Sequence, residues 1–310
     1  MFLIDVDGVL KLGHTPFNFS KQVLTQLYDN KIPHVLLSNA CGAEEQFSER
    51  LSKILDFQID PEKVVLSSSP LSNYLIQNPL DKILVLGSNT LADRFFSKFS
   101  NPYIYPEDII SRYPEIAPQY RHINQNVQSI RELCFDEIDT IIFFADSINW
   151  YADIQVVLDV VLNKSSINPH KQGSKTPKIF VSNPDITYAD DSVQPKLTVG
   201  AEVECFKSLY KSITSQDVHI TYFGKPYTPV YELSIKKLKS MDNYSPDKEI
   251  YMIGDSLQSD IKGANLNGIT SCLVLTGKVK NESELVDVPQ DLYPKKIFKN
   301  IQKALQELLK

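Results

Sequence analysis

Short apolar runs alternate with helical patterns through nearly the whole of this 310-residue sequence. The apolar runs are rich in β-forming residues, and segments with apolar residues at helical spacing lie between them. Alternation of this kind is typical of an α/β fold with mostly parallel sheets. The expected strands are 1–4, 34–37, 64–66, 83–86, 140–144, 179–181, 220–223, 250–253 and 272–275, and expected helices include 20–30, 43–56, 150–162 and 228–241.

The middle of the chain contains strand–helix–strand material of its own. Proline-rich and polar connections at 101–118 and 165–177 interrupt this region. We interpret 82–219 as a second α/β domain inserted into the first, so that 1–81 and 220–310 together form the main domain. The predicted fold is therefore a Rossmann-like, doubly wound parallel sheet with an inserted α/β domain.

Composition and charge exclude several classes of partner. Hydrophobic residues make up 42% of the chain and charged residues 23%, and the formal net charge is −6. No apolar run approaches the ~18 residues of a membrane span. Because the basic residues are scattered, we do not expect a nucleic-acid partner. One local cluster of basic residues near the C-terminus has roughly helical spacing, and we interpret it as a solvated helix face. It comprises Lys295, Lys296, Lys299 and Lys303.

The cysteines indicate an intracellular protein with reduced thiols. No pair has CxxC spacing, and Cys41 is interpreted as a packed or adventitious thiol. The first expected strand begins at Met1, which leaves no room for a targeting presequence, so either the protein is cytoplasmic or this chain lacks its leader. The four cysteines are Cys41, Cys134, Cys205 and Cys272.

Two polar clusters follow expected strands in the first forty residues. Asp5 and Asp7 stand two apart, so on a strand both carboxylates would point to the same face, and Gly8 allows a sharp turn afterwards. One carboxylate could attack phosphorus while the other handles the proton of the leaving oxygen, although a polar strand end is the simpler interpretation. Ser38 and Asn39 could hold phosphate oxygens, or could cap a helix or form a turn.

Two more clusters follow strands near the C-terminus. Lys225, between Gly224 and Pro226, could offer a compact positive charge to a phosphate. Taken alone, it could equally be a surface lysine at the start of a loop, without a function. Asp255 could bind a hard cation beside the first cluster, and Asp260 could orient it, although helix capping also suits these residues. Ligands of open α/β sheets bind outside the carboxyl ends of the strands, so all four clusters could meet in one crevice.

In this order the four clusters resemble the signature motifs of the haloacid dehalogenase superfamily, and the resemblance covers nearly the whole chain. An insertion between the second and third motifs is similar to the C2 cap of class IIA members. Several stretches resemble the branch named after the cat eye syndrome critical region protein 5. These stretches are 146–155, 182–185, 223–227 and 271–277.

The resemblance implies a magnesium-dependent phosphatase. Asp5 would be the nucleophile and Asp7 the general acid and base. Ser38 and Lys225 would hold the phosphate with Asn39 nearby. Asp260 would orient Asp255 without contacting the metal ion. Mg²⁺ would lie on Asp5, the backbone carbonyl of Asp7, and Asp255. This assignment requires that the carboxylates of Asp5 and Asp255 lie close enough to share one cation.

The resemblance also suggests a substrate class and a location. The substrate would be a small phosphorylated metabolite, with glycerol phosphate or a related phospholipid precursor as a plausible class. Members of the branch are often mitochondrial, and related proteins often dimerise through their caps. The run Val199-Gly-Ala-Glu202 and the pair Ala40-Cys41 depart from the branch pattern, which puts specificity in doubt more than chemistry.

Two rival functions fit these motifs less well, and a few polar residues have no assigned role. Dehalogenases and phosphonatases of this superfamily typically lack the second aspartate, so Asp7 disfavours both. A catalytically weak binding or scaffold protein would usually have lost a motif residue, and none is lost here. Asn183, Asp185 and Tyr188 could face the crevice, although a capped turn explains the run 183–185 about equally well, and His14 receives no role.

Overall fold

The computed structural model describes residues 1–123, 129–133, 135–190, 192 and 194–310. The chain divides into two compact units, of which the second extends beyond the 82–219 expected from the sequence and begins within helix α3 (Ser68–Gln77). The core unit comprises Met1–Pro70, Thr187–Lys196 and Gly224–Lys310, and the inserted unit comprises Leu71–Ile186 and Leu197–Phe223.

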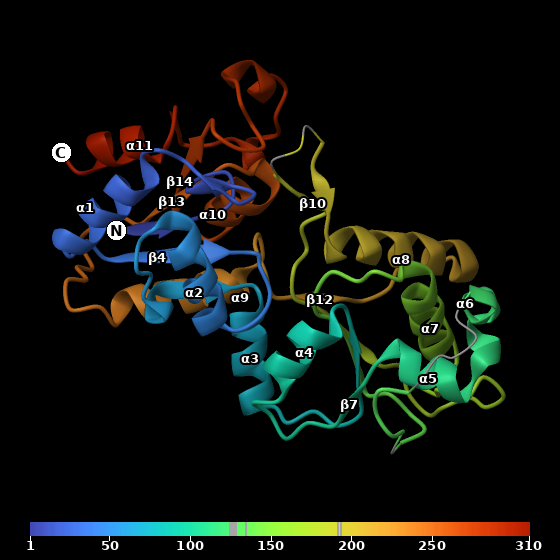
Figure 1. The fold of residues 1–310 in the computed structure, drawn as a ribbon. Coiled ribbons are helices and arrows are strands. Elements are labelled where there is room, and N and C mark those ends of the chain that lie inside the picture. Colours follow the sequence, from blue (N-terminus) through green and yellow to red (C-terminus); the bar gives the residue numbers. More distant parts are fainter. Residues whose placement is uncertain (124–128, 134, 191, 193) are drawn as a thin grey trace. The chain divides into compact units, whose positions relative to one another are not determined.

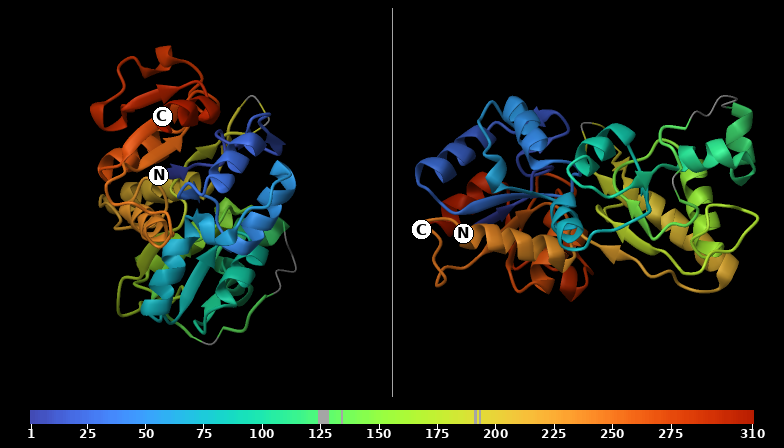
Figure 2. Two further views of the ribbon diagram at one scale, coloured as in Figure 1. Left: turned by 90° about the vertical axis from the view of Figure 1, so that its left-hand side faces the viewer. Right: turned by 90° about the horizontal axis from the view of Figure 1, so that it is seen from below.

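The core unit is built on a six-stranded parallel sheet with the strand order β15-β14-β13-β1-β4-β5. Parallel sheets need helical crossovers, and the helices are visible on both faces of the sheet in Figures 1 and 2. The strands are β1 (Phe2–Ile4), β4 (His34–Ser38), β5 (Val64–Leu66), β13 (Tyr251–Gly254), β14 (Thr270–Val274) and β15 (Lys296–Phe298).

Alternate residues of these strands pack into two different apolar clusters, because successive side chains of a strand point to opposite faces. Phe2 and Ile4 contact α1, α2 and α11 on one face, whereas Leu3 contacts α9 and α10 on the other. Burial on both faces explains why the strands are apolar throughout. The helices are α1 (Ser20–Asp29), α2 (Glu44–Leu55), α9 (Thr228–Lys239), α10 (Lys262–Leu266) and α11 (Ile301–Leu308).

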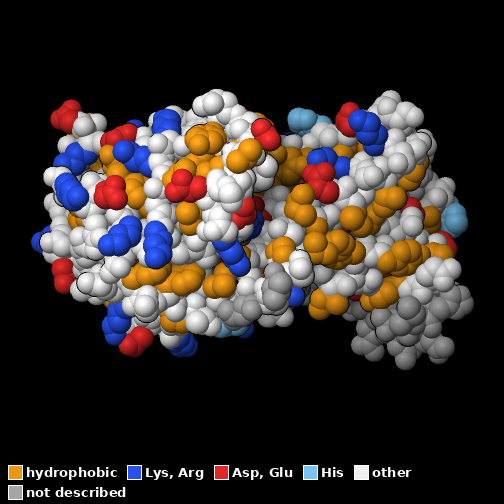
Figure 3. Space-filling model, turned by 90° about the horizontal axis from the view of Figure 1, so that it is seen from above, with side chains coloured by type: hydrophobic (Ala, Val, Ile, Leu, Met, Phe, Trp, Pro, Cys, Tyr) orange, Lys and Arg blue, Asp and Glu red, His pale blue; other side chains and the backbone are white. Residues whose placement is uncertain are grey.

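The prediction that four lysines near the C-terminus lie on one helix face is wrong. Of the four lysines only Lys303 lies in a helix, α11, whereas Lys296 begins the edge strand β15 and Lys295 and Lys299 flank that strand. Ile297 and Phe298 pair with β14, so strand pairing overrides the apparent helical spacing. Lysines at a sheet edge oppose pairing with another chain. On the face shown in Figure 3, basic and acidic side chains of the core unit are interspersed.

The inserted unit has a five-stranded parallel sheet with the order β12-β9-β8-β6-β7. Helices α5, α7 and α8 pack on one face, and aromatic residues of α3 and α4 pack on the other. Its strands are β6 (Ile83–Leu86), β7 (Tyr103–Ile104), β8 (Thr140–Phe143), β9 (Lys178–Val181) and β12 (Thr221–Tyr222). Its other helices are α4 (Asn89–Phe96), α5 (Pro106–Arg112), α6 (Pro118–Ile123), α7 (Trp150–Leu162) and α8 (Val199–Thr214).

Two short hairpins complete the chain: β2 (Lys11–Leu12) pairs with β3 (Thr15–Pro16), and β10 (Thr187–Tyr188) pairs with β11 (Lys196–Leu197). None of the described helices is both long enough and apolar enough to cross a membrane. Cys41, Cys205 and Cys272 are free thiols, and Cys134 lies outside the described residues.

A buried acid in the inserted unit distinguishes its core from an ordinary apolar one. Glu202 of α8 is fully buried, and among the described residues neither of its carboxylate oxygens has a hydrogen-bond partner. Burial, with Asp153 and Asp146 nearby, raises the pKa of Glu202 to about 9. The Glu202 carboxyl group is therefore protonated at neutral pH.

We predict that Glu202→Gln removes a pH dependence of stability. The folded-state pKa lies above the usual value near 4.5, so unfolding releases a proton between that pH and about 9. Over this window the wild-type free energy of unfolding should fall by up to about 1.4 kcal/mol per pH unit. Thermal unfolding at pH 5 and pH 8 should show a smaller loss for the variant. The exposed Glu204→Gln on the same helix is the control, and equal losses in all three proteins would contradict the prediction.

Candidate active site

The register of the core sheet brings two of the predicted clusters beside the first. Ile4 of β1 lies level with Ile253 of β13 and with Leu36 of β4. Asp5 follows β1 directly, Asp255 follows β13 directly, and Ser38 is the last residue of β4. All three therefore lie at the carboxyl edge of adjacent parallel strands, where open α/β sheets bind ligands.

Lys225 reaches this edge by a different route from the one expected. The strand before it, β12, belongs to the sheet of the inserted unit, so Lys225 does not follow a strand of the core sheet. Its Nζ nevertheless donates to Asp5 Oδ1 at 2.6 Å, to Asp260 Oδ1 at 2.7 Å and to the Leu37 carbonyl at 3.1 Å. An ammonium group has three donors, so all three are used. The side chain is only 2% exposed.

The charged groups of this cluster shift one another's pKa values. Burial alone would lower the pKa of Lys225, but the carboxylates of Asp260 and Asp5 raise it well above its ordinary value. Burial, together with Asp260, raises the pKa of Asp5 well above its usual range and that of Asp255 to about 7. Lys225 and, for Asp255, also Lys278 counteract these shifts only in part, so the cluster is short of positive charge.

The carboxylates fit a divalent cation. Oxygen atoms of Asp5, Asp255 and Asp260 lie within 4.8 Å of one another. Asp260 is already bonded, because its Oδ2 accepts from the backbone N–H groups of Asp255 and Ser256 at 3.1 and 3.0 Å. Within the described part of the chain, no hydrogen bond reaches Asp5 Oδ2 or Asp255 Oδ1. These two oxygens are hard ligands of the kind that a divalent cation prefers, and Asp260 holds the backbone from which the Asp255 side chain projects.

Two glycines make room for the Asp255 side chain. Gly8 has a φ of +81°, and a Cβ atom there would lie 2.3 Å from Asp255 Oδ2. A Cβ atom on Gly277 would lie 1.9 Å from the same oxygen. The backbone N–H of Lys278 donates to Asp255 Oδ2 at 2.6 Å, and Thr276 Oγ1 donates to the Gly8 carbonyl at 2.5 Å. The carboxylate is therefore held by backbone that any larger residue would displace.

The loop 276–278 was not recognised as part of the site from the sequence. A signal was present, because Thr276, Gly277 and Lys278 form one more polar cluster directly after an expected strand. The loop supplies backbone groups rather than a reactive side chain, and such roles leave little trace in residue type.

Asn39 fixes the backbone of Lys225. Its Nδ2 donates to the Lys225 carbonyl at 3.0 Å, and its Oδ1 accepts from the Lys225 N–H at 2.8 Å. Residues 186 positions apart are thus joined by a reciprocal pair of buried hydrogen bonds. Ser38 Oγ accepts from the Ala40 N–H at 3.1 Å, which makes a local turn and orients the hydroxyl at the sheet edge.

Asp7 is more exposed than the buried carboxylates, with its side chain 32% exposed against 9% for Asp5. Lys11 of β2 forms a salt bridge with Asp7 Oδ1, and the same Nζ donates to the Gly13 carbonyl at 3.0 Å. Lys11 was also not singled out from the sequence. Its position four residues after Asp7, past a glycine turn, gave no helical or strand spacing from which to infer the contact.

Among the unassigned residues, Asn183 behaves as a turn residue. Its Oδ1 accepts from the Asp185 N–H at 2.9 Å, which is the capped turn considered for this run. Cys41 lies against Ser67, with Sγ 3.3 Å from the hydroxyl oxygen. Tyr188 lies in the hairpin strand β10. None of these contacts involves the carboxylate cluster.

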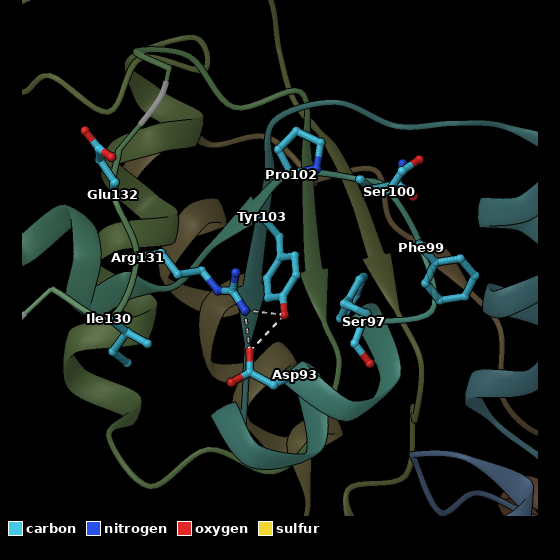
Figure 4. A pocket seen from close by; sticks show the side chains of 11 residues that line it. Asp93, Ser97, Phe99, Ser100, Pro102, Tyr103, Ile130, Arg131 and Glu132 are labelled. Atoms are coloured by element: carbon cyan, nitrogen blue, oxygen red, sulfur yellow. Dashed lines mark hydrogen bonds and ion pairs between the residues drawn. The ribbon is translucent and has the colours of Figure 1, made fainter.

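A separate hollow of about 780 Å³ lies in the inserted unit (Figure 4). The guanidinium of Arg131 lies over the Tyr103 ring, 3.8 Å from its centroid, and forms an ion pair with Asp93 at 2.7 Å. Because Asp93 already neutralises this arginine, the hollow has no unpaired cation from Arg131 to offer a phosphate. The carboxylate cluster of the core unit is the better candidate for an active site.

Comparisons with known proteins agree with the motif set. The model for haloacid dehalogenase-like hydrolases matches residues 2–97, and a second, HAD-hydrolase-like model matches residues 222–304. Two curated relatives are fungal. A cardiolipin synthase (CMP-forming)/mitochondrial hydrolase fusion protein of Schizosaccharomyces pombe is 30% identical over 287 residues, covering 88% of this chain. This chain spans only 47% of that fusion protein.

The second relative is a mitochondrial hydrolase of Saccharomyces cerevisiae, 26% identical over 337 residues, covering 99% of this chain and 95% of the relative. Among solved structures, the glycerol phosphate phosphatase of Mycobacterium tuberculosis in complex with magnesium superposes with a TM-score of 0.66 at 18% identity. That match covers 97% of this chain and 75% of the other, and shows the same fold.

The chain belongs to the haloacid dehalogenase-like hydrolases. The family models match both halves of the core unit, which carry every motif residue predicted from the sequence. With the paired aspartates Asp5 and Asp7 in place, the chain is an enzyme of the phosphoric monoester hydrolase type.

We predict that Asn39→Ala acts through Lys225. The substitution removes both hydrogen bonds that hold the Lys225 backbone and leaves a buried N–H and carbonyl unpaired, at a cost of about 1–3 kcal/mol each. We expect a lower free energy of unfolding in urea and a lower kcat/KM for a phosphate ester. Asn30→Ala, which removes an exposed bond to the Gln26 carbonyl, is the control. A variant with unchanged stability and turnover would refute the anchoring role.

Proposed function

We propose that this protein is a magnesium-dependent phosphatase that hydrolyses a small phosphate monoester through an aspartyl-phosphate on Asp5. The observation that carries the proposal is the convergence of Asp5, Asp255 and Lys225 on one sheet edge, with the carboxylate oxygens close enough to share a cation. Asp5 and Asp255 lie 250 positions apart in the sequence, so this convergence is a property of the fold.

Each residue has a distinct task in the proposed reaction. The Asp5 carboxylate attacks phosphorus and forms an acyl phosphate while the bond to the leaving oxygen breaks. Asp7 gives its proton to the leaving alcohol and then takes one from the water that cleaves the acyl phosphate. Bound Mg²⁺, held by Asp5, Asp255 and the Asp7 carbonyl, would screen the repulsion between the two anions. Lys225 supplies further positive charge, and Ser38 and the nearby Asn39 border the phosphate.

Asp7 favours phosphate monoesters over the other substrates of the superfamily. An alkoxide leaving group needs a proton, whereas a halide or a carbon leaving group does not need one from a carboxyl group at this position. The Asp7 side chain is 32% exposed, so a leaving alcohol and water have access to it. This supports ester hydrolysis rather than dehalogenation or phosphonate cleavage.

The relatives support a substrate class and a location. A structural neighbour is a glycerol phosphate phosphatase, and one relative joins a mitochondrial hydrolase to a cardiolipin synthase. We therefore propose a glycerol phosphate or a related phospholipid precursor as the substrate, and the mitochondrion as the compartment. A homodimer formed through the inserted unit is part of the same proposal, by family resemblance.

The roles of the two aspartates can be separated by substitution. Asp5→Asn removes the nucleophile and should abolish turnover of p-nitrophenyl phosphate, while Asp7→Asn should slow it by about 10²–10⁴-fold. Circular dichroism should show that both variants remain folded. Asp56→Asn, at an exposed helix end, serves as the matched control. Undiminished hydrolysis by the Asp5 variant would rule out the covalent mechanism.

Metal removal tests the cation and the catalytic function together. EDTA should abolish release of phosphate from p-nitrophenyl phosphate, and added Mg²⁺ should restore it. Titration calorimetry should show Mg²⁺ binding to the wild type and much weaker binding to Asp255→Asn, because one of two carboxylate ligands is lost. Binding of Mg²⁺ without any hydrolysis would favour the alternative, a catalytically weak binding or scaffold protein.

A further inference from the structure

Lys11 places a second ammonium group beside the catalytic carboxylates. Its backbone is fixed in the turn after β1, where the Lys11 carbonyl accepts from the Gly8 N–H at 2.7 Å and its N–H donates to the Val6 carbonyl at 3.2 Å. The side chain is only 12% exposed, and its Nζ contacts Asp7 Oδ1 and the Gly13 carbonyl. Lys11 is therefore held at Asp7 by its backbone as well as by its charge.

The ammonium group of Lys11 has one donor left for a ligand. Of its three N–H donors, one is directed to Asp7 and one to Gly13, and no other acceptor contacts it among the residues that the structure describes. Lys225, in contrast, uses all three donors inside the cluster. Unlike Lys225, Lys11 thus has capacity to bind a further oxygen atom.

The contact between Lys11 and Asp7 sets an upper limit on the distance from Lys11 Nζ to the leaving oxygen of a substrate. If Asp7 protonates the leaving oxygen, that oxygen lies one hydrogen bond from the Asp7 carboxylate, and Lys11 Nζ is in contact with the same carboxylate. If both groups contact the same carboxylate oxygen, the ammonium and the leaving oxygen are at most about 5–6 Å apart; if the leaving oxygen contacts the other carboxylate oxygen, they are at most about 7–8 Å apart. A substituent two or three bonds from the leaving oxygen falls within reach of Lys11.

We propose that Lys11 is a specificity-determining residue that selects phosphate esters with an acceptor oxygen, a hydroxyl or carboxylate, on the carbon next to the ester carbon. The inference rests on the proposed phosphatase function and refines its substrate class. An ammonium in that position would repel a leaving group that carries its own positive charge. Lys11 therefore favours glycerol-type and hydroxy-acid phosphates and opposes phosphorylated amino alcohols.

The test compares two esters of equal chain length, 2-hydroxyethyl phosphate and O-phosphoethanolamine, with Mg²⁺ present. Wild-type enzyme should show the higher kcat/KM for the hydroxyl compound. In Lys11→Met and Lys11→Gln the ratio of the two kcat/KM values should fall by about tenfold, as expected for unit charges at this separation in a partly exposed site. Lys11→Arg should keep most of the preference, because the charge remains.

Comparing substrates within one variant separates recognition from a structural effect, since damage to Asp7 would slow both esters alike. Lys21→Met, which removes an exposed lysine paired with Asp56, controls for the loss of one positive charge and should leave the ratio unchanged. A ratio that is the same in wild type, Lys11→Met and Lys11→Gln, with p-nitrophenyl phosphate still hydrolysed, overturns the role of Lys11. Failure of wild-type enzyme to hydrolyse any of the three esters overturns the phosphatase proposal itself.

Discussion

The buried ammonium group of Lys225 joins the parts of this site. It lies between Asp5, which ends the first strand, and Asp260, which follows the strand leading to Asp255. Removing one partner of such a buried pair typically costs about 3–5 kcal/mol, because the remaining charges lose their compensation in a medium that solvates them poorly. The contact therefore constrains three segments of the chain to one arrangement.

The same cluster shows why a cation belongs there. Burial favours the neutral forms of Asp5 and Asp255, and Lys225, joined at Asp255 by Lys278, offsets only part of that effect. A divalent cation supplies the missing positive charge without needing space for another side chain. The close approach of Gly8 and Gly277 to Asp255 leaves no room for such a side chain in any case. Steric and electrostatic constraints thus point to the same solution.

Much of this arrangement could be predicted from the sequence. The strands that carry Asp5, Ser38 and Asp255 are short, apolar and followed at once by polar residues, so their ends were visible in the pattern. The orienting role expected of Asp260 agrees with its hydrogen bonds to the backbone of Asp255 and Ser256.

Features that depend on contacts between distant segments could not be predicted from the sequence. Strand β12 lies in a short run of β-forming residues at 220–223, like the other expected strands, and nothing local shows that it joins the sheet of the inserted unit. The lysines near the C-terminus have a spacing that fits a helix, but pairing of β15 with β14 decides their structure. Lys11 and the loop 276–278 act through a salt bridge and backbone groups, which depend on the folded chain and not on residue type alone.

The bonds from Asn39 to Lys225 lie at the point where the polypeptide returns from the inserted unit at Gly224. Every contact that orients the reactive end of this lysine comes from residues of the core unit. Whatever evolutionary change occurs in the inserted segment, the charge at the sheet edge need not be rebuilt. Recombination that exchanged that segment for another module would leave the three hydrogen bonds of the Lys225 ammonium group in place, because the residues that accept them are inherited with the core unit.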